Sequence, residues 1–303
     1  MNNAFYFSIG TLIIDDIVQP DGKTHMKTLG GGATHAVMGM RVWAEHVGLL
    51  TRLAKDFNPQ DFPALQANFD LSGLERLELA HTPRAWQLFD QDGKRTEVFK
   101  TNFQELRQLL PQPSPLKGIY AQAAGVHLHA APEMVEAWLP FLREVKGLSV
   151  LWEPWDPFCV PKNRTEFYRL GRMMDIVSPN LEEARALSGL SDPNAIALEW
   201  QKQGIPMSLI RLGKNGCLVC GKTKNPQHIL SYPVRKVVDV TGAGNACCGG
   251  FIVGLHQTGD PSQAAKYGNI SASFALRQYG ALYPLAGVHQ KALWRLKRYK
   301  TEI

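Results

Sequence analysis

Residues 237–251 read Val-Val-Asp-Val-Thr-Gly-Ala-Gly-Asn-Ala-Cys-Cys-Gly-Gly-Phe, which combines a β-branched run, a glycine-rich turn and the start of a helix. Gly242 and Gly244 place no side chains in the turn, so backbone amides can approach an anion there. The positive end of the following helix points at the same place, which favours a bound phosphate group. A tight turn that needs glycine for positive φ is the alternative interpretation. The turn itself is no Walker sequence, because it ends in Gly-Ala-Gly-Asn and not in Gly-Lys-Ser or Gly-Lys-Thr.

The rest of the chain alternates between two kinds of hydrophobic pattern. Short apolar runs predict strands at 5–10, 49–54, 125–130, 148–152, 176–178 and 207–211. Longer runs with helical spacing predict helices at 33–47, 135–146, 181–187, 195–203 and 262–278. This alternation indicates an α/β fold, with a mainly parallel sheet and helices on both faces. Two hairpin patterns, at roughly 16–29 and 84–100, predict a small separate sheet.

Length, composition and charge narrow the class of protein. A chain of 303 residues with 45% hydrophobic and 20% charged residues is expected to form one large globular domain, residues 1–303. The sequence has no apolar run of about 20 residues and no basic leader before Asp15, so we expect a cytoplasmic protein without a membrane span. The net charge of +6 includes a basic C-terminal segment, where a solvated helix face is favoured over nucleic-acid binding.

Two groups of side chains raise the question of a metal site. Four of the five cysteines lie close together in pairs, at Cys217 and Cys220 and at Cys247 and Cys248. Buried thiols are favoured over zinc ligands, because two adjacent cysteines rarely reach one tetrahedral ion. His127 and His129 alternate onto one face of a predicted strand, where a core or pocket-lining role is favoured over a metal.

The glycine-rich turn also carries a family resemblance. Residues 239–245 resemble the second signature of the PfkB family of carbohydrate and nucleoside kinases, typically Asp-Thr-Thr-Gly-Ala-Gly-Asp. Asn245 stands in place of the final aspartate, and Val240 in place of the first threonine. The resemblance implies a three-layer ribokinase-like fold with a β-sheet lid, formed by roughly 16–29 and 84–100. It also implies ATP and Mg²⁺ as cofactors, a small sugar- or nucleoside-like substrate, and in some members a homodimer held by lid contacts.

The altered turn bears directly on catalysis. In the family, the residues at Gly242, Ala243 and Gly244 form an anion hole for the transferring phosphoryl group, and the final aspartate takes the proton of the acceptor hydroxyl. An amide at Asn245 cannot take a proton at neutral pH, although it can orient a hydroxyl by hydrogen bonding. A general base typically contributes about 10²–10⁴ in rate. The sequence therefore predicts slow phosphoryl transfer, with an inactive pseudokinase that binds nucleotide or sugar as the alternative.

Further matches on the acceptor side precede the turn in the chain. Asp15 resembles the aspartate that holds substrate hydroxyls, and Thr34 occupies the place of a sugar-binding asparagine. His35 follows it and is either a replacement base or a packed helix histidine. Glu153 and Asp156 lie where a predicted strand ends, and ligands of parallel sheets bind there; a solvated loop charge is the alternative for either acid. The predicted substrate-binding residues are Asp15, Gly31, Gly32, Thr34, His35, Arg84, Trp86 and Glu153.

Matches on the nucleotide side lie in the second half of the chain. Asn180 and Glu183 resemble the family's Pro-Asn-x-x-Glu element, which implies that they organise magnesium and its waters. Residues 211–216 resemble the strand and turn that border the nucleotide, and Asn269 lies in a segment resembling the one beside the adenine. The predicted cofactor-binding residues are Asn180, Glu183, Arg211, Gly213, Gly216, Asp239, Thr241 and Asn269.

Overall fold

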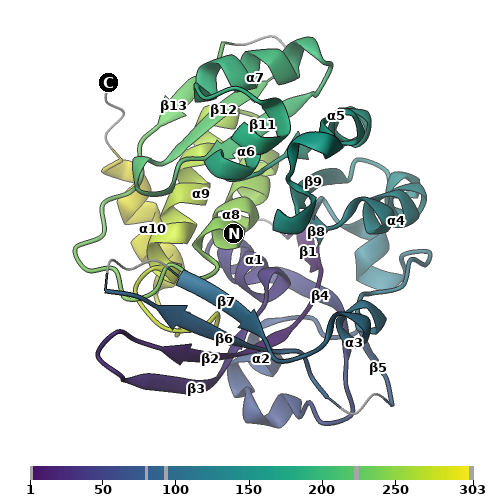
Figure 1. The fold of residues 1–303 in the computed structure, drawn as a ribbon, viewed down its shortest axis with the longest axis vertical. Coiled ribbons are helices and arrows are strands. Elements are labelled where there is room, and N and C mark those ends of the chain that lie inside the picture. The colour runs from purple at the N-terminus through teal and green to yellow at the C-terminus, as the bar shows by residue number, and fades with distance from the viewer. Residues whose placement is uncertain (1–2, 79–80, 92–94, 222–224, 300–303) are drawn as a thin grey trace.

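The computed structural model describes residues 3–78, 81–91, 95–221 and 225–299, and within them the strands form two sheets (Figure 1). The larger sheet has the order β13-β12-β11-β10-β9-β8-β1-β4-β5. Its strands are β1 (Phe5–Ile9), β4 (His46–Leu53), β5 (Leu74–Arg76), β8 (Gly125–Ala130), β9 (Ser149–Pro154), β10 (Ile176–Val177), β11 (Met207–Arg211), β12 (Cys217–Gly221) and β13 (Gln227–Ile229). Neighbours from β5 to β11 pair in parallel, whereas β12 and β13 pair antiparallel. The predicted α/β class is confirmed.

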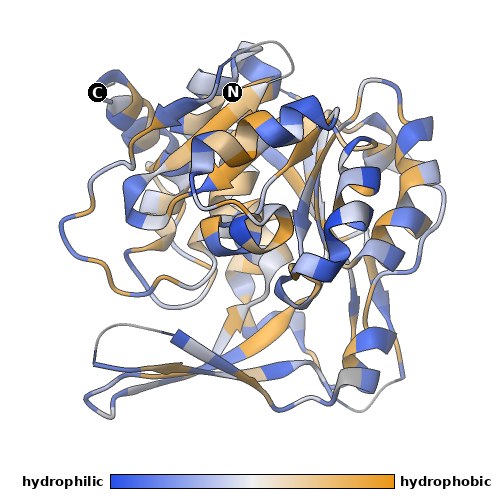
Figure 2. Ribbon diagram, turned by 45° about the horizontal axis from the view of Figure 1, so that its top comes forward, coloured by the Kyte–Doolittle hydropathy of each residue, from blue (hydrophilic) through white to orange (hydrophobic). Residues whose placement is uncertain are grey.

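Helices cover both faces of the large sheet. They are α1 (Gly32–Arg41), α2 (Pro63–Asn68), α3 (Phe103–Gln108), α4 (Pro132–Glu144), α5 (Arg164–Gly171), α6 (Leu181–Ser188), α7 (Pro193–Lys202), α8 (Ala243–Thr258), α9 (Pro261–Ala275) and α10 (Val288–Lys297). Consecutive residues of β1 enter separate cores: Tyr6 packs with α1, α8 and α9, whereas Phe5 and Phe7 pack with the side of α4 to α7. Apolar residues accordingly concentrate in the large sheet and the helix faces against it (Figure 2). These two cores make the sheet the middle of three layers.

The first predicted helix differs from the observed one. The apolar pattern predicts a helix over 33–47, but α1 ends at Arg41 and β4 begins at His46. Trp43 and Ala44 are buried in the connection, where the Arg41 guanidinium donates a hydrogen bond to the Ala44 carbonyl at 3.1 Å. Because the residues of this loop are buried, they are apolar, and their pattern in the sequence is the same as that of a longer helix.

A small sheet lies over one edge of the molecule and is here called the lid. It has the order β3-β2-β6-β7 and consists of β2 (Ile13–Val18), β3 (Thr24–Gly30), β6 (Arg84–Phe89) and β7 (Arg95–Phe99). Both predicted hairpins are therefore present, joined by parallel pairing of β2 with β6. Residues 92–94 of the predicted lid segment lie outside the described residues. The extent of the domain, 1–303, stays a prediction.

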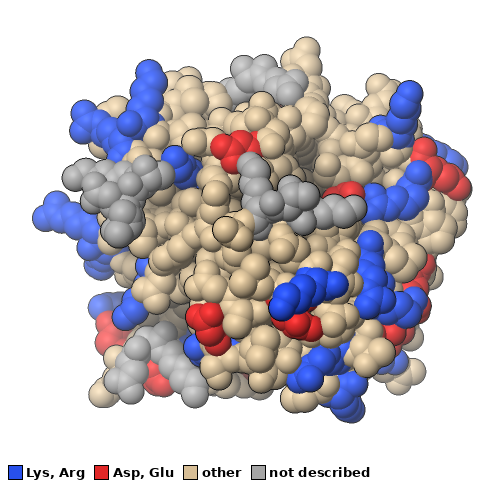
Figure 3. All heavy atoms as spheres, turned by 90° about the horizontal axis from the view of Figure 1, so that it is seen from above, with Lys and Arg blue, Asp and Glu red and all other residues tan. Residues whose placement is uncertain are grey.

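Charged side chains are distributed over the surface without a continuous basic groove on the face seen in Figure 3. There, Lys and Arg side chains lie mostly around the periphery, with Asp and Glu side chains among them. Among the helices that the structure describes, none combines the length and the apolarity needed to cross a membrane.

Close approach of α1 and α8 requires glycine. A Cβ atom at Gly39 would lie 2.1 Å from the Ala246 carbonyl oxygen, and one at Gly249 would lie 2.0 Å from the Ala36 carbonyl oxygen. Such contacts with backbone atoms cannot be relieved by a side-chain rotation. The two glycines therefore fix the distance between the helix that carries His35 and the helix that begins beside Asn245.

We expect Gly39→Ala to lower the free energy of unfolding by about 1–3 kcal/mol, because overpacking outweighs the gain of about 1 kcal/mol in helix propensity. Gly221→Ala is the matched control, since no atom lies within 4 Å of a Cβ at Gly221. Equilibrium urea denaturation measures both variants. Equal stability of the two variants would contradict the role of Gly39 in this helix crossing.

Candidate active site

The glycine-rich turn forms the N-terminus of α8 and opens into a cavity. Gly242 is the N-cap and has φ = 70°, a conformation that residues with a Cβ rarely adopt. The turn is fixed from behind by Asp239, a buried carboxylate that accepts a hydrogen bond from the Thr241 amide at 2.7 Å. Burial raises the pKa of Asp239. The first turn of α8 contains no acidic residue, so the positive end of the helix dipole is available to an anion, although the Ala243 amide already donates to the Val240 carbonyl at 3.3 Å.

A cavity of about 790 Å³ runs along the carboxyl ends of the parallel strands and past this turn. At one end it is lined by lid residues, including Asp15, Gln87, Arg95 and Glu97. At the other end it is lined by residues 213–216, by Tyr232 and by one side of α9. The turn from Thr241 to Asn245 lies between the two ends, so one cavity offers two regions that meet at this turn.

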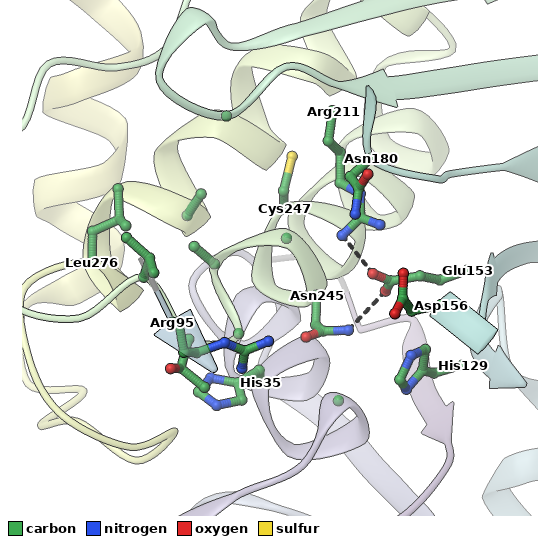
Figure 4. Close-up of a pocket in the computed structure, with 18 of the residues that line it drawn as sticks. His35, Arg95, His129, Glu153, Asp156, Asn180, Arg211, Asn245, Cys247 and Leu276 are labelled. Carbon is green, nitrogen blue, oxygen red and sulfur yellow. Dashed lines mark hydrogen bonds and ion pairs between the residues drawn. The ribbon is translucent and has the colours of Figure 1, made fainter. Parts of the chain in front are cut away.

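Glu153, at the end of β9, holds the centre of the site together (Figure 4). Its carboxylate is 4% exposed and receives three partners. The Asn245 Nδ2 donates to Oε2 at 2.9 Å, His127 Nε2 lies 2.7 Å from the same oxygen, and Arg211 Nη1 pairs with Oε1 at 2.5 Å. Burial raises the pKa of Glu153, but the Arg211 charge and the His127 hydrogen bond more than offset it, so the pKa lies well below its usual range. Glu153 is therefore a fixed negative charge and a poor proton acceptor.

A buried chain of polar side chains supports Glu153 from within the sheet. Ser8 Oγ lies 2.8 Å from Nδ1 of His127, whose Nε2 contacts Glu153. The order serine, histidine, acid resembles that of a hydrolase triad, but Ser8 and His127 are both fully buried. Because no substrate can reach Ser8, we interpret this chain as a support that orients the carboxylate.

Arg211 links the Glu153 carboxylate to the nucleotide-side region. Its Nη2 lies 3.5 Å from Oε2 of Glu183, and a Cβ at Gly244 would lie 2.0 Å from its Nη1. Glu183 also accepts a hydrogen bond from the Asn180 amide at 2.7 Å, within a capping box at the start of α6. Burial raises the pKa of Glu183. The glycine at 244 is thus required for the guanidinium to lie against the turn.

His35 lies on the other side of the turn. A Cβ at Gly242 would lie 2.0 Å from Cγ of His35, so the imidazole packs directly on the N-cap glycine. Its Nε2 is buried without a hydrogen-bond partner. Burial, followed by the charge of Arg95, lowers the pKa of His35 to about 4. The imidazole is therefore neutral at neutral pH.

The structure brings most of the predicted site residues to the cavity. Those that line it are Asp15, Gly31, Gly32, His35, Glu153, Asn180, Glu183, Arg211, Gly213, Gly216, Thr241, Gly242, Ala243, Gly244, Asn245 and Asn269. The amide nitrogen of Asn269 is engaged by Leu230 O at 2.8 Å and Tyr299 OH at 2.9 Å, so this side chain shapes the wall. Asp239 lies behind the turn, and Thr34 is fully buried within α1.

Arg84 and Trp86 do not line the cavity. Lid strands alternate their side chains, and Gln87 of β6 faces Asp15 whereas Arg84 forms a bidentate ion pair with Asp16. Trp86 packs under the Lys100 ammonium, 3.6 Å from the ring centroid. The two predicted residues therefore lie on the face of β6 opposite to Gln87, which lines the cavity.

Three polar lid residues at the cavity were not singled out by sequence: Gln87, Arg95 and Glu97. Gln87 Nε2 donates to Asp15 Oδ1 at 2.9 Å and to Glu97 at 2.7 Å, while Arg95 Nη1 donates to Gln87 Oε1 at 3.2 Å. The signal available in the sequence was the alternation of side chains along a strand. Gln87 lies one position beyond Trp86 and so on the other face of β6, and Arg95 and Glu97 share one face of β7. Burial raises the pKa of Asp15 to about 7, although the Gln87 hydrogen bond acts in the opposite direction.

The four paired cysteines that raised the question of a zinc site lie inside the fold. Cys217, Cys220, Cys247 and Cys248 are all buried. Ligand atoms of His127, Glu153 and Cys248 do come within 4.8 Å of one another. In the structure, however, the Glu153 carboxylate is already paired with the Arg211 guanidinium at 2.5 Å and contacts His127 at 2.7 Å.

Comparison with known proteins gives a consistent result. A model of the pfkB family of carbohydrate kinases matches residues 5–286. A cytidine kinase from Thermococcus kodakarensis is 26% identical, over 90% of this chain and 96% of its own length. A probable sugar kinase from Rhizobium etli superposes with a TM-score of 0.79 at 19% identity, covering 97% of this chain and 99% of that chain. A putative ribokinase II from E. coli in complex with ATP and Mg²⁺ superposes with a TM-score of 0.74 at 18% identity, covering 98% and 100%.

We expect Glu153→Gln to lower the free energy of unfolding by about 3–5 kcal/mol, because it removes the closer of the two carboxylates that pair with the buried Arg211 charge. Glu182→Gln is the matched control: its partner is Arg185 on the surface, and we expect a change below about 1 kcal/mol. Urea denaturation at neutral pH measures both.

The pH dependence of this difference has a defined sign. Because the folded-state pKa of Glu153 is depressed, its contribution is complete above the ordinary value of 4.5 and is lost as pH falls through the lower folded-state pKa. The stability gap between the unsubstituted protein and Glu153→Gln should therefore shrink below about pH 4. A gap that stays constant down to pH 3 would contradict an ionised Glu153.

Proposed function

The chain belongs to the pfkB family of carbohydrate kinases, and we propose that it transfers the terminal phosphoryl group of ATP to a hydroxyl of a sugar- or nucleoside-like acceptor. The observation that carries this proposal is the single cavity that joins the lid region to the nucleotide-side region across the turn Gly242–Asn245. A phosphate bound at the amides of this turn would lie between donor and acceptor. Phosphoryl transfer depends mainly on such positioning and on charge neutralisation.

On the donor side, residues 213–216, Asn269 and α9 would border the nucleotide. Asn180 and Glu183 are the residues that would hold Mg²⁺, since Glu183 is a buried carboxylate that faces the cavity beside the turn. When bound, magnesium would neutralise phosphate charge. Cytoplasmic location and a homodimer formed through the lid stay predictions.

On the acceptor side, the lid supplies acidic and amide groups suited to hydroxyls. Asp15 and Glu97 are bridged by the Gln87 amide, and both face the cavity. Carboxylate oxygens accept hydrogen bonds from neighbouring hydroxyls of a polyol or ribose. Closure of the lid over them would exclude water, which a kinase requires to avoid hydrolysis of ATP.

The proton of the acceptor hydroxyl needs a group other than Asn245. The amide nitrogen of Asn245 points to Glu153, and its oxygen points to the opposite side, toward Arg95 and His35 (Figure 4). We infer that the oxygen accepts a hydrogen bond from the attacking hydroxyl and that His35 Nε2 receives the proton. The hydroxyl oxygen then bonds to phosphorus as the bond to the ADP oxygen breaks. With a pKa of about 4, His35 is about as basic as an ordinary aspartate.

Binding without turnover is the second candidate function. It is favoured by the same amide, because Asn245 is fixed to an ionised carboxylate that Arg211 neutralises. A protein of this kind would bind nucleotide or sugar and act as a regulatory partner. The measurement of ADP formation separates the two candidates.

We expect slow ADP formation by the unsubstituted protein with Mg·ATP and pooled sugars and nucleosides. His35→Gln should lower it by about 10²-fold, because it removes the proton acceptor. His46→Gln is the matched control, since His46 is exposed at the start of β4. No acceptor-dependent ADP above background in any protein would support the binding role instead.

The substitution Asn245→Asp requires a compensating change. Alone it would place a second carboxylate beside Glu153, so we expect little gain in ADP formation because of like-charge repulsion. Asn245→Asp combined with Glu153→Gln keeps one negative charge and should raise the rate by about 10–10²-fold. A larger gain from the single substitution would show that Glu153 does not control the site.

Acceptor affinity should depend on Asp15. Ionisation near its raised pKa of about 7 makes Asp15 a better hydrogen-bond acceptor, so KM for the acceptor should fall as pH rises from 6 to 8. In Asp15→Asn this dependence should disappear while KM rises about 10-fold or more. An unchanged pH profile would exclude Asp15 from acceptor binding.

A further inference from the structure

Arg211 is a buried cation at the phosphoryl site. Its side chain is 12% exposed, and it lines the cavity between Gly244 and Glu183. The guanidinium contacts two carboxylates, at 2.5 Å to Glu153 and at 3.5 Å to Glu183. A guanidinium is ionised at all relevant pH values, so this charge is permanent.

The donors of Arg211 are not all used by these carboxylates. A guanidinium carries five N–H bonds in a planar fork, and Arg211 Nε is buried without a hydrogen-bond partner. Buried donors in native structures are normally satisfied. An unsatisfied donor on a cationic side chain that lines a cavity indicates a ligand with acceptor oxygens.

The position of the guanidinium identifies the ligand chemistry. Nη1 lies where a Cβ of Gly244 would be, immediately beside the amides at the N-terminus of α8. An anion bound to those amides would therefore meet the guanidinium as well. Planar forks of this kind bind phosphate oxygens through two hydrogen bonds.

We propose that Arg211 contacts the terminal phosphate of the nucleotide and supplies a fixed positive charge that lessens the dependence of nucleotide binding on Mg²⁺. Glu153 is then a positioning residue, because it holds both Arg211 and Asn245 on one carboxylate. This inference rests on the proposed function, since it assumes that the donor nucleotide occupies the cavity. It goes further by assigning part of the charge neutralisation to the protein itself.

The contact should discriminate between triphosphate and diphosphate. Arg211 lies at the anion hole, where the terminal phosphate would bind, and ADP lacks that group. A hydrogen-bonded charge contact is worth about 1.5–3 kcal/mol, which corresponds to about 10–100-fold in affinity. Loss of Arg211 should therefore weaken binding of a triphosphate analogue and leave that of ADP nearly unchanged.

The test is isothermal titration calorimetry with AMP-PNP and with ADP, each in Mg²⁺ and in EDTA. The main variant is Arg211→Gln with Glu153→Gln, because changing both residues removes both charges of the 2.5 Å pair, and the longer contact of Arg211 with Glu183 is lost with them. Arg185→Gln is the matched control for loss of a surface arginine that pairs with Glu182. Urea denaturation confirms that each variant is folded.

We compare the Kd for AMP-PNP in EDTA with the Kd in Mg²⁺ for each protein. We expect this increase in Kd to be about 10-fold or more larger in the double variant than in the unsubstituted protein. Equal factors in the two proteins, or equal losses for AMP-PNP and ADP, would overturn the role of Arg211 and leave the proposed function standing. Absence of nucleotide binding in the unsubstituted protein under all conditions would contradict both.

Discussion

The Glu153 carboxylate is a full charge in a place that water scarcely reaches, and the arrangement of the site follows from its compensation. Without partners such a charge would be neutralised or would destabilise the fold. Here a guanidinium, an imidazole and an amide surround it, each from a different part of the chain. The family resemblance places a carboxylate at residue 245. In this protein the nearby carboxylate is that of Glu153, at the end of β9, and the Asn245 side chain donates a hydrogen bond to it.

This constraint connects the site to the scaffold. Ser8 and His127 lie on adjacent central strands, so the register of the sheet determines the direction of Glu153. On the other side of the turn, glycine contacts between α1 and α8 hold the His35 and Asn245 segments at a fixed distance. Both binding regions of the cavity therefore depend on rigid elements, whereas the lid supplies the residues that would adapt to an acceptor.

Sequence predicted the fold class, the small second sheet and the glycine-rich turn before a helix, because hydrophobic periodicity and a contiguous glycine motif are local signals. Contacts between distant strands have no local signal, so the convergence of Ser8, His127 and Arg211 on Glu153 required the structure. The lid face was ambiguous for a related reason. Both faces of β6 carry polar residues, and a shift of one position exchanges Trp86 for Gln87 at the cavity.

The central claim is that one cavity places a triphosphate against the α8 turn, with Arg211 and Asn245 held by Glu153. A crystal structure of the protein with AMP-PNP tests it most directly. The account predicts that the terminal phosphate contacts the amides of residues 242–245 and the Arg211 guanidinium, while the Asn245 amide nitrogen still donates to Glu153. A nucleotide bound elsewhere, or an Arg211 side chain turned away from the phosphate, would contradict it.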